Sequence, residues 1–412
     1  MDAHRVWAQV DLDALTHNLA RIRARLAPHV AVMLVVKADA YGHGAVAIAH
    51  HALRSGVQAF GVGTSAEALE LRQAGVRAPI LVLGTIVEEE AVACLRHGVH
   101  IALHSLDRCR MLQELAVRLG TLARVHVKVD TGMGRLGVLP ERALDLLQAV
   151  HDASRLSLCG IMTHIAAPEG AASPAAVEQL VVFDAVLRRA RERGLDGGWI
   201  HAGNSACIFT DLGTHYDAVR PGISAYGVLP DGLSGASELR PVLSLHTQVV
   251  FLKDVPAGAP VGYGSTWHAP AATRIATLPV GYSDGLSWRL GNRGEVLVRG
   301  QRARIVGRVS MDYTTIDVGD IPGVQVGDRV TLIGAQGDER IDLSEVAERA
   351  GTIPYEIACA VGQRVERLYL GADNEDLGPR GAGASGERAD APRPADRPGS
   401  PERPDAALDR VG

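Results

Sequence analysis

Residues 30–44 read VAVMLVVKADAYGHG, an unbroken apolar run that ends in a lysine and is followed by a short polar segment with two glycines. A run that is rich in β-branched residues and lacks polar alternation is typical of a strand buried on both faces of a parallel sheet. Seven further runs of this kind follow before residue 221. The eight runs are Val30–Val36, Gln58–Gly63, Ile80–Gly84, His100–His104, Arg124–Val129, Ser157–Met162, Trp199–Ala202 and Ala218–Arg220.

Amphipathic segments of about three turns separate these runs. Examples are Ser65–Ala74, Leu106–Leu119 and Ala175–Arg193. The alternation predicts an α/β fold, an N-terminal (β/α)8 TIM-type barrel over residues 11–230. An open doubly wound sheet stays open as an alternative, because the sequence does not show whether the sheet closes.

The pattern changes from Asp231 onward. Short, often alternating runs are separated there by Gly, Pro or Asp turns, and they predict a C-terminal all-β domain over residues 231–370. One such run is Leu243–Lys253. Residues 371–412 are rich in Pro, Gly, Arg and Asp and contain no aromatic residue, so we expect a disordered tail.

The composition excludes several classes of protein. The chain has 412 residues, of which 47% are hydrophobic, and a formal net charge of −5, which argues against a nucleic-acid-binding protein. Its five cysteines form no CxxC motif and favour a reducing compartment. We see no export signal and no apolar stretch of about 18 residues, so we expect a cytoplasmic protein without a membrane partner.

Polar residues recur where the predicted strands end. Lys37, Lys128, His164, Ser205 and Arg220 each close or directly follow one of the runs. The carboxyl ends of the strands meet at one face of a parallel barrel, so these side chains are expected to lie together. This face is therefore the candidate functional site.

Lys37 is open to two interpretations. It is either a strand-end lysine that reaches solvent, or an amine whose pKa is lowered by an apolar pocket so that it attacks a carbonyl group. The loops after the last two runs hold Ser205, Gly222 and Ile223, which offer a hydroxyl and two backbone N–H groups to a phosphate. A lysine beside a phosphate cradle is the arrangement that pyridoxal phosphate requires.

Two other motifs, for a dinucleotide site and for a metal site, are less well supported by the sequence than the pyridoxal phosphate site. Residues 132–137, GMGRLG, match GxGxxG, but the motif follows the fifth run rather than the first, and the next run does not end in an acidic residue. His50 and His51 lack the carboxylate or third ligand that a metal needs, so we expect no metal site.

Residues 36–44, VKADAYGHG, strongly resemble the pyridoxal phosphate attachment signature of alanine racemases. The resemblance extends over about residues 5–370 through segments that occur in the same order. These are KVDTGMGR (128–135), HAGNS (201–205), RPG (220–222), VGYG (261–264), VGYSDG (280–285), GRVSMD (307–312) and TIPYE (352–356).

The resemblance implies a head-to-tail homodimer whose active site lies between one subunit's barrel and the other subunit's β-domain. Residues 1–10 are then expected to pack on the β-domain. It also implies a role for each matched residue. Lys37 attaches the cofactor and acts as the D-side base, and Tyr263 of the partner subunit acts as the L-side base. Arg220 faces the pyridine nitrogen with His164 beside it, and Arg135 and Met311 contact the substrate. The phosphate is held by Tyr41, Ser205, Gly222, Ile223 and Tyr355.

The implied activity is interconversion of L-alanine and D-alanine, which supplies D-alanine for peptidoglycan. A broad-specificity or serine racemase of the same fold remains an alternative. A basic-amino-acid decarboxylase of this fold would need a cysteine and an acidic partner for the cofactor, where this chain offers Tyr263 and Arg220. A non-catalytic pyridoxal phosphate carrier usually has a barrel alone.

Two departures from the family pattern are Pro168, in a loop expected to be more regular, and Ser310, where many relatives carry cysteine. Lys128 matches a lysine that is carbamylated in some relatives.

Overall fold

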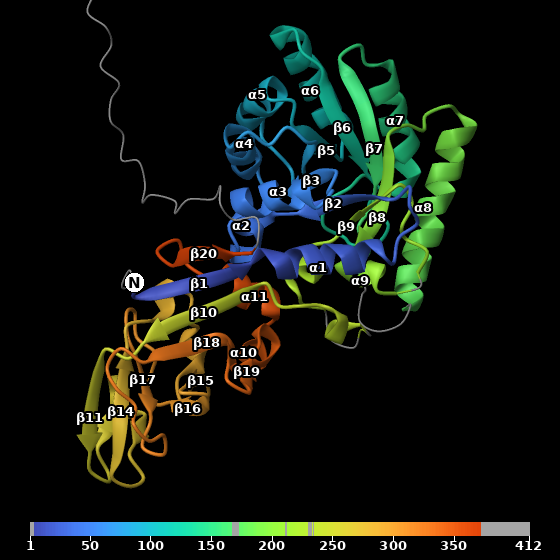
Figure 1. Ribbon diagram of the computed structural model, residues 1–412. Coiled ribbons are helices and arrows are strands. Elements are labelled where there is room, and N and C mark those ends of the chain that lie inside the picture. The colour runs from blue at the N-terminus through green and yellow to red at the C-terminus, as the bar shows by residue number, and fades with distance from the viewer. Residues whose placement is uncertain (1–3, 167–172, 211, 230–232, 234, 372–412) are drawn as a thin grey trace, which may run out of the picture. The chain divides into compact units, whose positions relative to one another are not determined.

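The computed structural model describes residues 4–166, 173–210, 212–229, 233 and 235–371. Its first part is a closed barrel of eight parallel strands, surrounded by helices (Figure 1). The strands are β2 (Ala31–Val35), β3 (Ala59–Val62), β4 (Ile80–Val82), β5 (His100–Leu103), β6 (Ala123–Lys128), β7 (Leu156–Met162), β8 (Trp199–Asn204) and β9 (Ala218–Arg220). Pairing of β2 with β9 closes the barrel, so the predicted fold is confirmed and the open sheet is excluded.

The sequence explains these elements locally. Every residue of β2, β3 and β4 is buried, as expected for strands that have helices on one side and the barrel interior on the other. Thr64 caps α4 by accepting a hydrogen bond from the Glu67 amide, and the Thr64 amide donates one to the Glu67 carboxylate. The barrel helices are α1 (Leu12–Arg23), α2 (Lys37–Gly42), α3 (Ala45–Arg54), α4 (Ser65–Gln73), α5 (Glu88–Arg96), α6 (Leu106–Leu119), α7 (Ala143–Asp152), α8 (Pro174–Glu192) and α9 (Ser205–Ile208).

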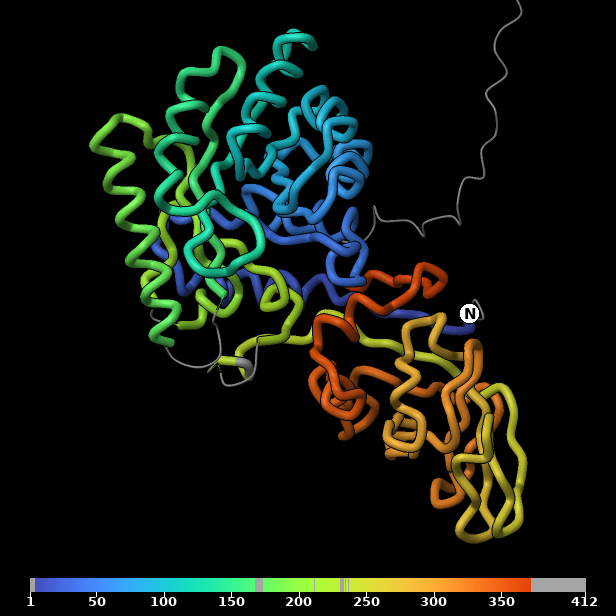
Figure 2. The backbone as a smooth tube through the Cα atoms, turned by 180° about the vertical axis from the view of Figure 1, so that it is seen from behind, coloured from blue at the N-terminus to red at the C-terminus, as the bar shows by residue number. Residues whose placement is uncertain are grey.

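The second part is built on a largely antiparallel sheet, which confirms a C-terminal domain of β structure where the sequence predicts an all-β domain (Figure 2). Its strand order is β11-β14-β17-β16-β15-β18-β10-β1-β20, with β19 paired to β18. The bounds are β1 (Val6–Asp11), β10 (Leu243–Gln248), β11 (Phe251–Val255), β14 (Thr273–Leu278), β15 (Glu295–Val298), β16 (Gln301–Ile305), β17 (Thr314–Asp317), β18 (Arg329–Gln336), β19 (Glu339–Ile341) and β20 (Glu366–Leu370); β12 (Pro260–Val261) pairs separately with β13 (Trp267–His268).

This sheet combines segments that are far apart in the chain. Strand β1 lies between β10, its antiparallel neighbour, and β20, its parallel neighbour. Val10 is opposite Leu243, and Gln9 is opposite Leu368. Strand β1, from the start of the described chain, is therefore an interior strand of the second part, next to the edge strand β20.

The structure differs from the sequence expectation in two details of this part. The run Leu243–Lys253 divides between β10 and β11, which pair with different strands, β18 and β14. Two helices also occur among the strands, α10 (Leu343–Ala350), capped by Asp342, and α11 (Pro354–Cys359), which begins with a proline. Short 3₁₀ turns cover Pro140–Arg142, Ile223–Tyr226, Ala236–Glu238, Tyr263–Ser265, Tyr282–Asp284 and Trp288–Leu290.

Pro168 and the tail 372–412 lie outside the described residues. Within the ranges that the structure describes, no helix has the length and apolar character needed to cross a membrane.

Candidate active site

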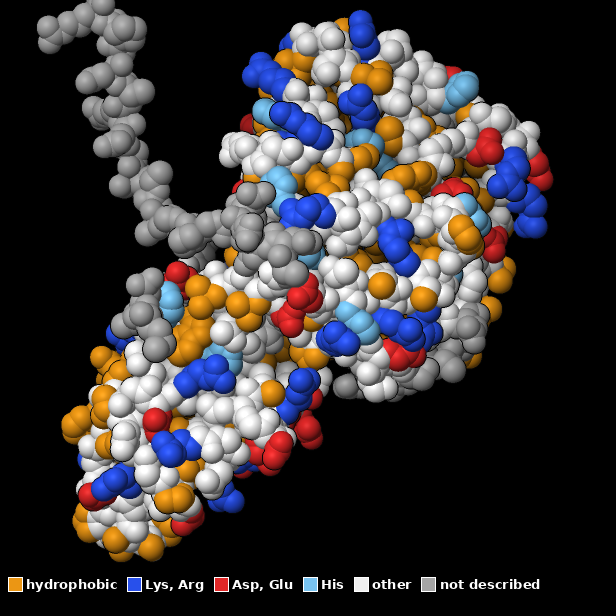
Figure 3. All heavy atoms as spheres, in the orientation of Figure 1, with side chains coloured by type: hydrophobic (Ala, Val, Ile, Leu, Met, Phe, Trp, Pro, Cys, Tyr) orange, Lys and Arg blue, Asp and Glu red, His pale blue; other side chains and the backbone are white. Residues whose placement is uncertain are grey.

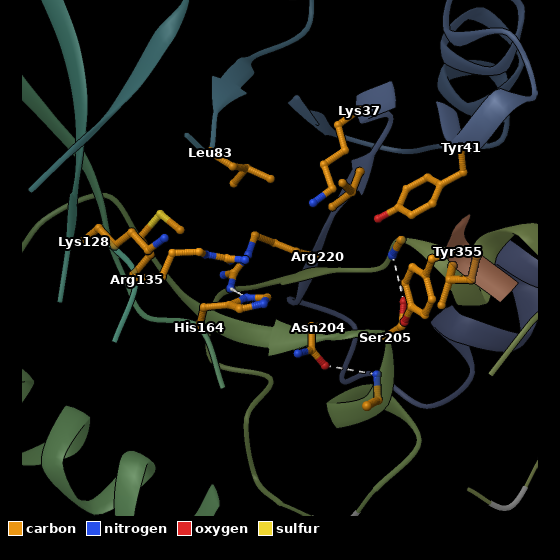
Figure 4. A pocket seen from close by; sticks show the side chains of 15 residues that line it. Lys37, Tyr41, Leu83, Lys128, Arg135, His164, Asn204, Ser205, Arg220 and Tyr355 are labelled. Carbon is orange, nitrogen blue, oxygen red and sulfur yellow. Dashed lines mark hydrogen bonds between the residues drawn. The ribbon is translucent and has the colours of Figure 1, made fainter. Parts of the chain in front are cut away.

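A pocket of about 190 Å³ opens at the carboxyl ends of the barrel strands (Figure 4). It brings together most of the residues singled out in the sequence. It is lined by Lys37, Tyr41, Arg135, His164, Ser205, Arg220, Gly222, Ile223 and Tyr355, together with Val35, Leu83, Lys128, Met162, Asn204 and Ala206. Sequence reasoning had assigned no role to the second group except Lys128.

The turn that carries Lys37 and Tyr41 has an unusual backbone. Four consecutive non-glycine residues, from Ala38 to Tyr41, have φ between 52° and 55° and form a left-handed turn within α2. Each such residue costs about 1–2 kcal/mol relative to a right-handed turn. Hydrogen bonds offset part of this cost: the Ala38 amide donates to Glu67 (2.7 Å), and Asp39 accepts from the Ala45 amide (2.7 Å).

The second part of the chain also contacts this turn. A Cβ placed on Gly42 would lie 2.2 Å from the carbonyl oxygen of Ala358 in α11, so the close approach of the two segments requires glycine. Arg367 donates to the carbonyl oxygen of Gly42 at 3.2 Å. The same helix α11 places Tyr355 beside Tyr41, with 6.1 Å between the ring centroids.

Lys37 lies at the rim of the pocket and is exposed. Its exposure agrees with the interpretation as a strand-end lysine that reaches solvent, and its position in the pocket lining agrees with the interpretation as a reactive amine. Its amine points toward the pocket in Figure 4.

A group of hydrogen-bond donors converges at one end of the pocket. Ser205 Oγ accepts hydrogen bonds from the Gly222 amide (2.8 Å), the Ser224 amide (3.2 Å) and the Ser224 hydroxyl (3.0 Å), which leaves its own proton free. Burial raises the pKa of the Tyr41 phenol, which keeps it a donor at neutral pH. The phenols of Tyr41 and Tyr355 have no hydrogen-bond partner among the described residues. A cluster of free hydroxyl donors suits a phosphate.

Arg220 is the most constrained side chain in the pocket, with 3% of its surface exposed. Its guanidinium donates to the carbonyl oxygens of Thr163 (2.7 Å), Ala202 (3.0 Å) and His201 (2.8 Å). It also donates to ring nitrogens, Nδ1 of His201 at 2.7 Å and Nδ1 of His164 at 3.4 Å. Burial lowers its pKa to about 10, so it stays a cation at neutral pH.

A row of histidines continues from Arg220 through the barrel interior. His201 Nε2 lies 2.9 Å from Nδ1 of His126, and His126 Nε2 lies 3.0 Å from Nδ1 of His100. Arginine only donates, so Nδ1 of His201 accepts and its Nε2 carries the proton. The same reasoning applies to His126 and then to His100, so each of the three neutral rings accepts at Nδ1 and carries its proton on Nε2. We call this row, His201–His126–His100, the histidine ladder; sequence reasoning missed it.

Lys128 lies on β6 beside the ladder and is buried. Burial and, after it, the positive charges of Arg135 and Arg220 together lower its pKa to about 8. Arg135 reaches the same side of the pocket from the loop after β6.

Tyr263 and Met311 do not line the pocket. Both lie in the second part, where the Tyr263 side chain is 74% exposed and that of Met311 is 54% exposed. Ser310, next to Met311, donates its hydroxyl to the carbonyl oxygen of Tyr313 at 2.7 Å.

Comparison with family models matches both parts of the chain. Residues 10–230 match "Alanine racemase, N-terminal domain", and residues 242–369 match "Alanine racemase, C-terminal domain". The chain is 40% identical over 373 residues to the alanine racemase of Methanococcus maripaludis, which covers 90% of this chain and all of that protein. It is 41% identical over 364 residues to the alanine racemase of Halothermothrix orenii, which covers 88% of this chain and 96% of that protein.

Solved structures agree with these sequence matches. The alanine racemase from Bacillus anthracis with bound L-Ala-P superposes with a TM-score of 0.84 at 36% identity, over 90% of this chain and 96% of that one. The alanine racemase from Bartonella henselae with covalently bound pyridoxal phosphate gives a TM-score of 0.81 at 30% identity, over 89% of this chain and 99% of that one.

Proposed function

Because the chain belongs to the alanine racemase family, we propose that it interconverts L-alanine and D-alanine by a two-base mechanism with pyridoxal phosphate in the barrel pocket. The observation that carries this proposal is the convergence of Lys37, the hydroxyl donors and Arg220 in one pocket. The related structure with covalently bound pyridoxal phosphate supports the choice of cofactor.

The residues present fit this cofactor. Lys37 would attach it covalently, and Arg220 with His164 beside it would lie at its pyridine nitrogen. Its phosphate would be held by the hydroxyl groups of Tyr41, Ser205 and Tyr355 and by the amide of Ile223. The Gly222 amide would join them by exchanging its bond to Ser205 Oγ for one to the phosphate. When bound, the cofactor withdraws electrons from the α-carbon of the substrate and so makes the α-hydrogen acidic.

Racemisation needs one base on each side of the α-carbon. Lys37 supplies the amine on one side. Tyr263 lies outside the pocket of its own chain, so the second base would be the partner subunit's Tyr263 in a head-to-tail homodimer. The same assembly would bring the partner subunit's Met311 to the substrate, while Arg135 of the first subunit would bind its carboxylate.

His164 and Arg220 explain how a phenol could act as a base. An ordinary phenol has a pKa of about 10 and holds its proton at neutral pH. Burial lowers the pKa of His164 to about 3, so its ring is neutral and accepts from Arg220 at Nδ1. Its Nε2–H is then free to donate to the oxygen of a tyrosinate, and the positive charge of Arg220 behind it favours that anion.

Arg220 also favours racemisation over side reactions. A guanidinium does not give up its proton, so a pyridine nitrogen that faces it stays unprotonated. The electron withdrawal that the cofactor would supply would then be weaker than with a carboxylate partner, and this would favour return of the proton to the α-carbon over other reactions.

The test is conversion of L-alanine to D-alanine by the purified protein with added pyridoxal phosphate. We expect conversion by the parent enzyme and by Lys253→Ala, a control for an exposed lysine, and loss of conversion in Lys37→Ala and in Tyr263→Phe. If the protein holds the cofactor but does not convert alanine, the substrate assignment is wrong, and serine and other amino acids are to be assayed for a racemase of broader specificity.

We further propose that the enzyme works in the cytoplasm and supplies D-alanine for peptidoglycan. Deletion of its gene should then make growth depend on added D-alanine, provided that no second racemase is present. Growth without D-alanine in such a strain would contradict this role.

A further inference from the structure

A second cavity, of about 480 Å³, lies at the opposite end of the barrel, where β4, β5 and β6 begin. It is lined by Arg72, Arg77, Pro79, Arg96, His97, Gly98, His100 and Arg124. Four of these are arginines and none is an acid. Figure 3 shows several blue side chains on the visible face over α4, α5 and α6, and these are arginines because these helices contain no lysine.

The positive charge in this cavity is not neutralised by the protein. Among the residues that the structure describes, none of the four arginines forms an ion pair with a carboxylate. The pKa of Arg72 is lowered by burial and then by the charges of Arg77 and Arg124. These guanidiniums therefore repel one another, and an anion between them would remove that repulsion.

Only part of the cluster has a structural role. Arg72 donates to the carbonyl oxygens of Val76, Ala78 and His97 and so fixes the loops at the barrel's amino end. Arg77 and Arg124 donate to no group among the described residues. The Arg124 guanidinium lies across Gly98, where a Cβ would be 3.3 Å from its Nη1.

The histidine ladder ends in this cavity. His100 Nδ1 accepts from His126, so its Nε2 carries the proton, and this N–H has no protein partner within the described part of the chain. The inner wall of the cavity therefore presents one more hydrogen-bond donor. The four arginines and His100 therefore all offer donors to the cavity, whereas His97 donates from Nδ1 to the carbonyl oxygen of Ala93 at 2.9 Å.

We propose that this cavity is an anion site that binds a phosphate-class oxyanion between Arg77, Arg124 and the Nε2–H of His100. Guanidinium groups bind phosphate oxygens in pairs of parallel hydrogen bonds, and a tetrahedral oxyanion offers acceptors to the donors of Arg77, Arg124 and His100. The site is separate from the phosphate cradle at Ser205 and Gly222, which lies at the carboxyl ends of the strands.

The test uses the cofactor-loaded enzyme, in which the phosphate cradle is filled. Calorimetric titrations with inorganic phosphate and with pyrophosphate are run at constant ionic strength, with chloride as the balancing anion. We expect saturable binding of at least one probe, weakened about tenfold or more in the double variant Arg77→Gln/Arg124→Gln, because charged hydrogen bonds are lost. Preference for pyrophosphate would indicate a diphosphate ligand, and equal binding would indicate free phosphate.

The matched control is Arg110→Gln/Arg118→Gln, which removes the same charge from α6, outside the cavity. It should bind as the parent enzyme does. The bound anion should also raise the melting temperature of the parent and the control, but not that of the Arg77→Gln/Arg124→Gln variant. Absence of saturable binding, or equal weakening in both double variants, would overturn the proposal.

Discussion

Lys128 and Arg220 are both buried in this barrel, but the groups that surround their charges differ. Arg220 has three carbonyl oxygens and two ring nitrogens as acceptors, which compensate for its removal from water. Lys128 has two arginines as neighbours, and they disfavour its charged form together with burial. The two residues should therefore respond in opposite ways to substitution.

Replacing Lys128 with methionine should stabilise the protein at neutral pH. The pKa of Lys128 falls from 10.5 to about 8 on folding, so at pH 7 the folded chain bears a charged amine at a cost on the order of 3 kcal/mol. Between pH 8 and pH 10.5 the folded chain releases this proton while the unfolded chain keeps it, and the cost disappears. Thermal unfolding of Lys128→Met against parent should show a gain at pH 7 that shrinks toward pH 10.

The exposed Lys253→Met serves as its control and should show no such pH dependence. A lower melting temperature for Lys128→Met at pH 7 would mean that the amine has a favourable partner in the folded enzyme.

Replacing Arg220 with glutamate should change the course of the reaction. A carboxylate would let the ring nitrogen of the cofactor keep a proton, and the side reaction of transamination should rise relative to racemisation. Three buried carbonyl oxygens would lose their donor, so we also expect a loss of stability of about 1–3 kcal/mol for each of them. Pyruvate formed per racemisation event measures the partition, and an unchanged ratio in the folded variant would refute the role assigned to Arg220.

At the scale of elements, the left-handed turn of α2 depends on contacts from distant parts of the chain. Glu67 of α4, Ala358 of α11 and Arg367 of β20 all contact it. The conformation of Lys37 and Tyr41 is thus fixed by packing between elements rather than by the preferences of the turn's own residues.

Gly42→Ala should therefore be far more harmful than a matched glycine substitution elsewhere. Gly75 has a similar φ, +87° against +79°, but nothing lies within 4 Å of its would-be Cβ. We expect a loss of about 1 kcal/mol for Gly75→Ala from the backbone alone, and about 3 kcal/mol or more for Gly42→Ala, which also collides with Ala358. Denaturant unfolding measures both, and equal losses would show that α2 and α11 separate easily.

The sequence predicted the barrel strands and the residues at their ends, because apolar runs and strand direction are local properties of the chain. It could not predict the left-handed turn, since Ala38, Asp39 and Ala40 have no local preference for it. The histidine ladder depends on the relative positions of β5, β6 and β8, which only the closed barrel fixes. These features arise from three-dimensional packing.

At the scale of the whole molecule, the proposed dimer makes each active site depend on two chains. Lys37 lines the pocket, whereas Tyr263 lies outside it on the same chain. In a mixed dimer of Lys37→Ala and Tyr263→Phe chains, one of the two sites would combine an intact lysine with an intact tyrosine.

Mixing these two inactive variants should therefore restore activity. After equal amounts are unfolded and refolded together, random pairing in a closed two-fold dimer gives about a quarter of the parent activity. Each variant refolded alone is the control and should remain inactive. If the mixture stays inactive although mixed dimers form, then the two bases of one active site do not come from different subunits.

The position of β1 also bears on the order in which the molecule is made. The ribosome synthesises Val6–Asp11 first, but both neighbours of this strand, β10 and β20, lie hundreds of residues downstream. At about 5–20 residues per second, on the order of tens of seconds pass before β20 emerges. The barrel can close during that interval, whereas the sheet of the second part cannot be completed until β20 has been synthesised.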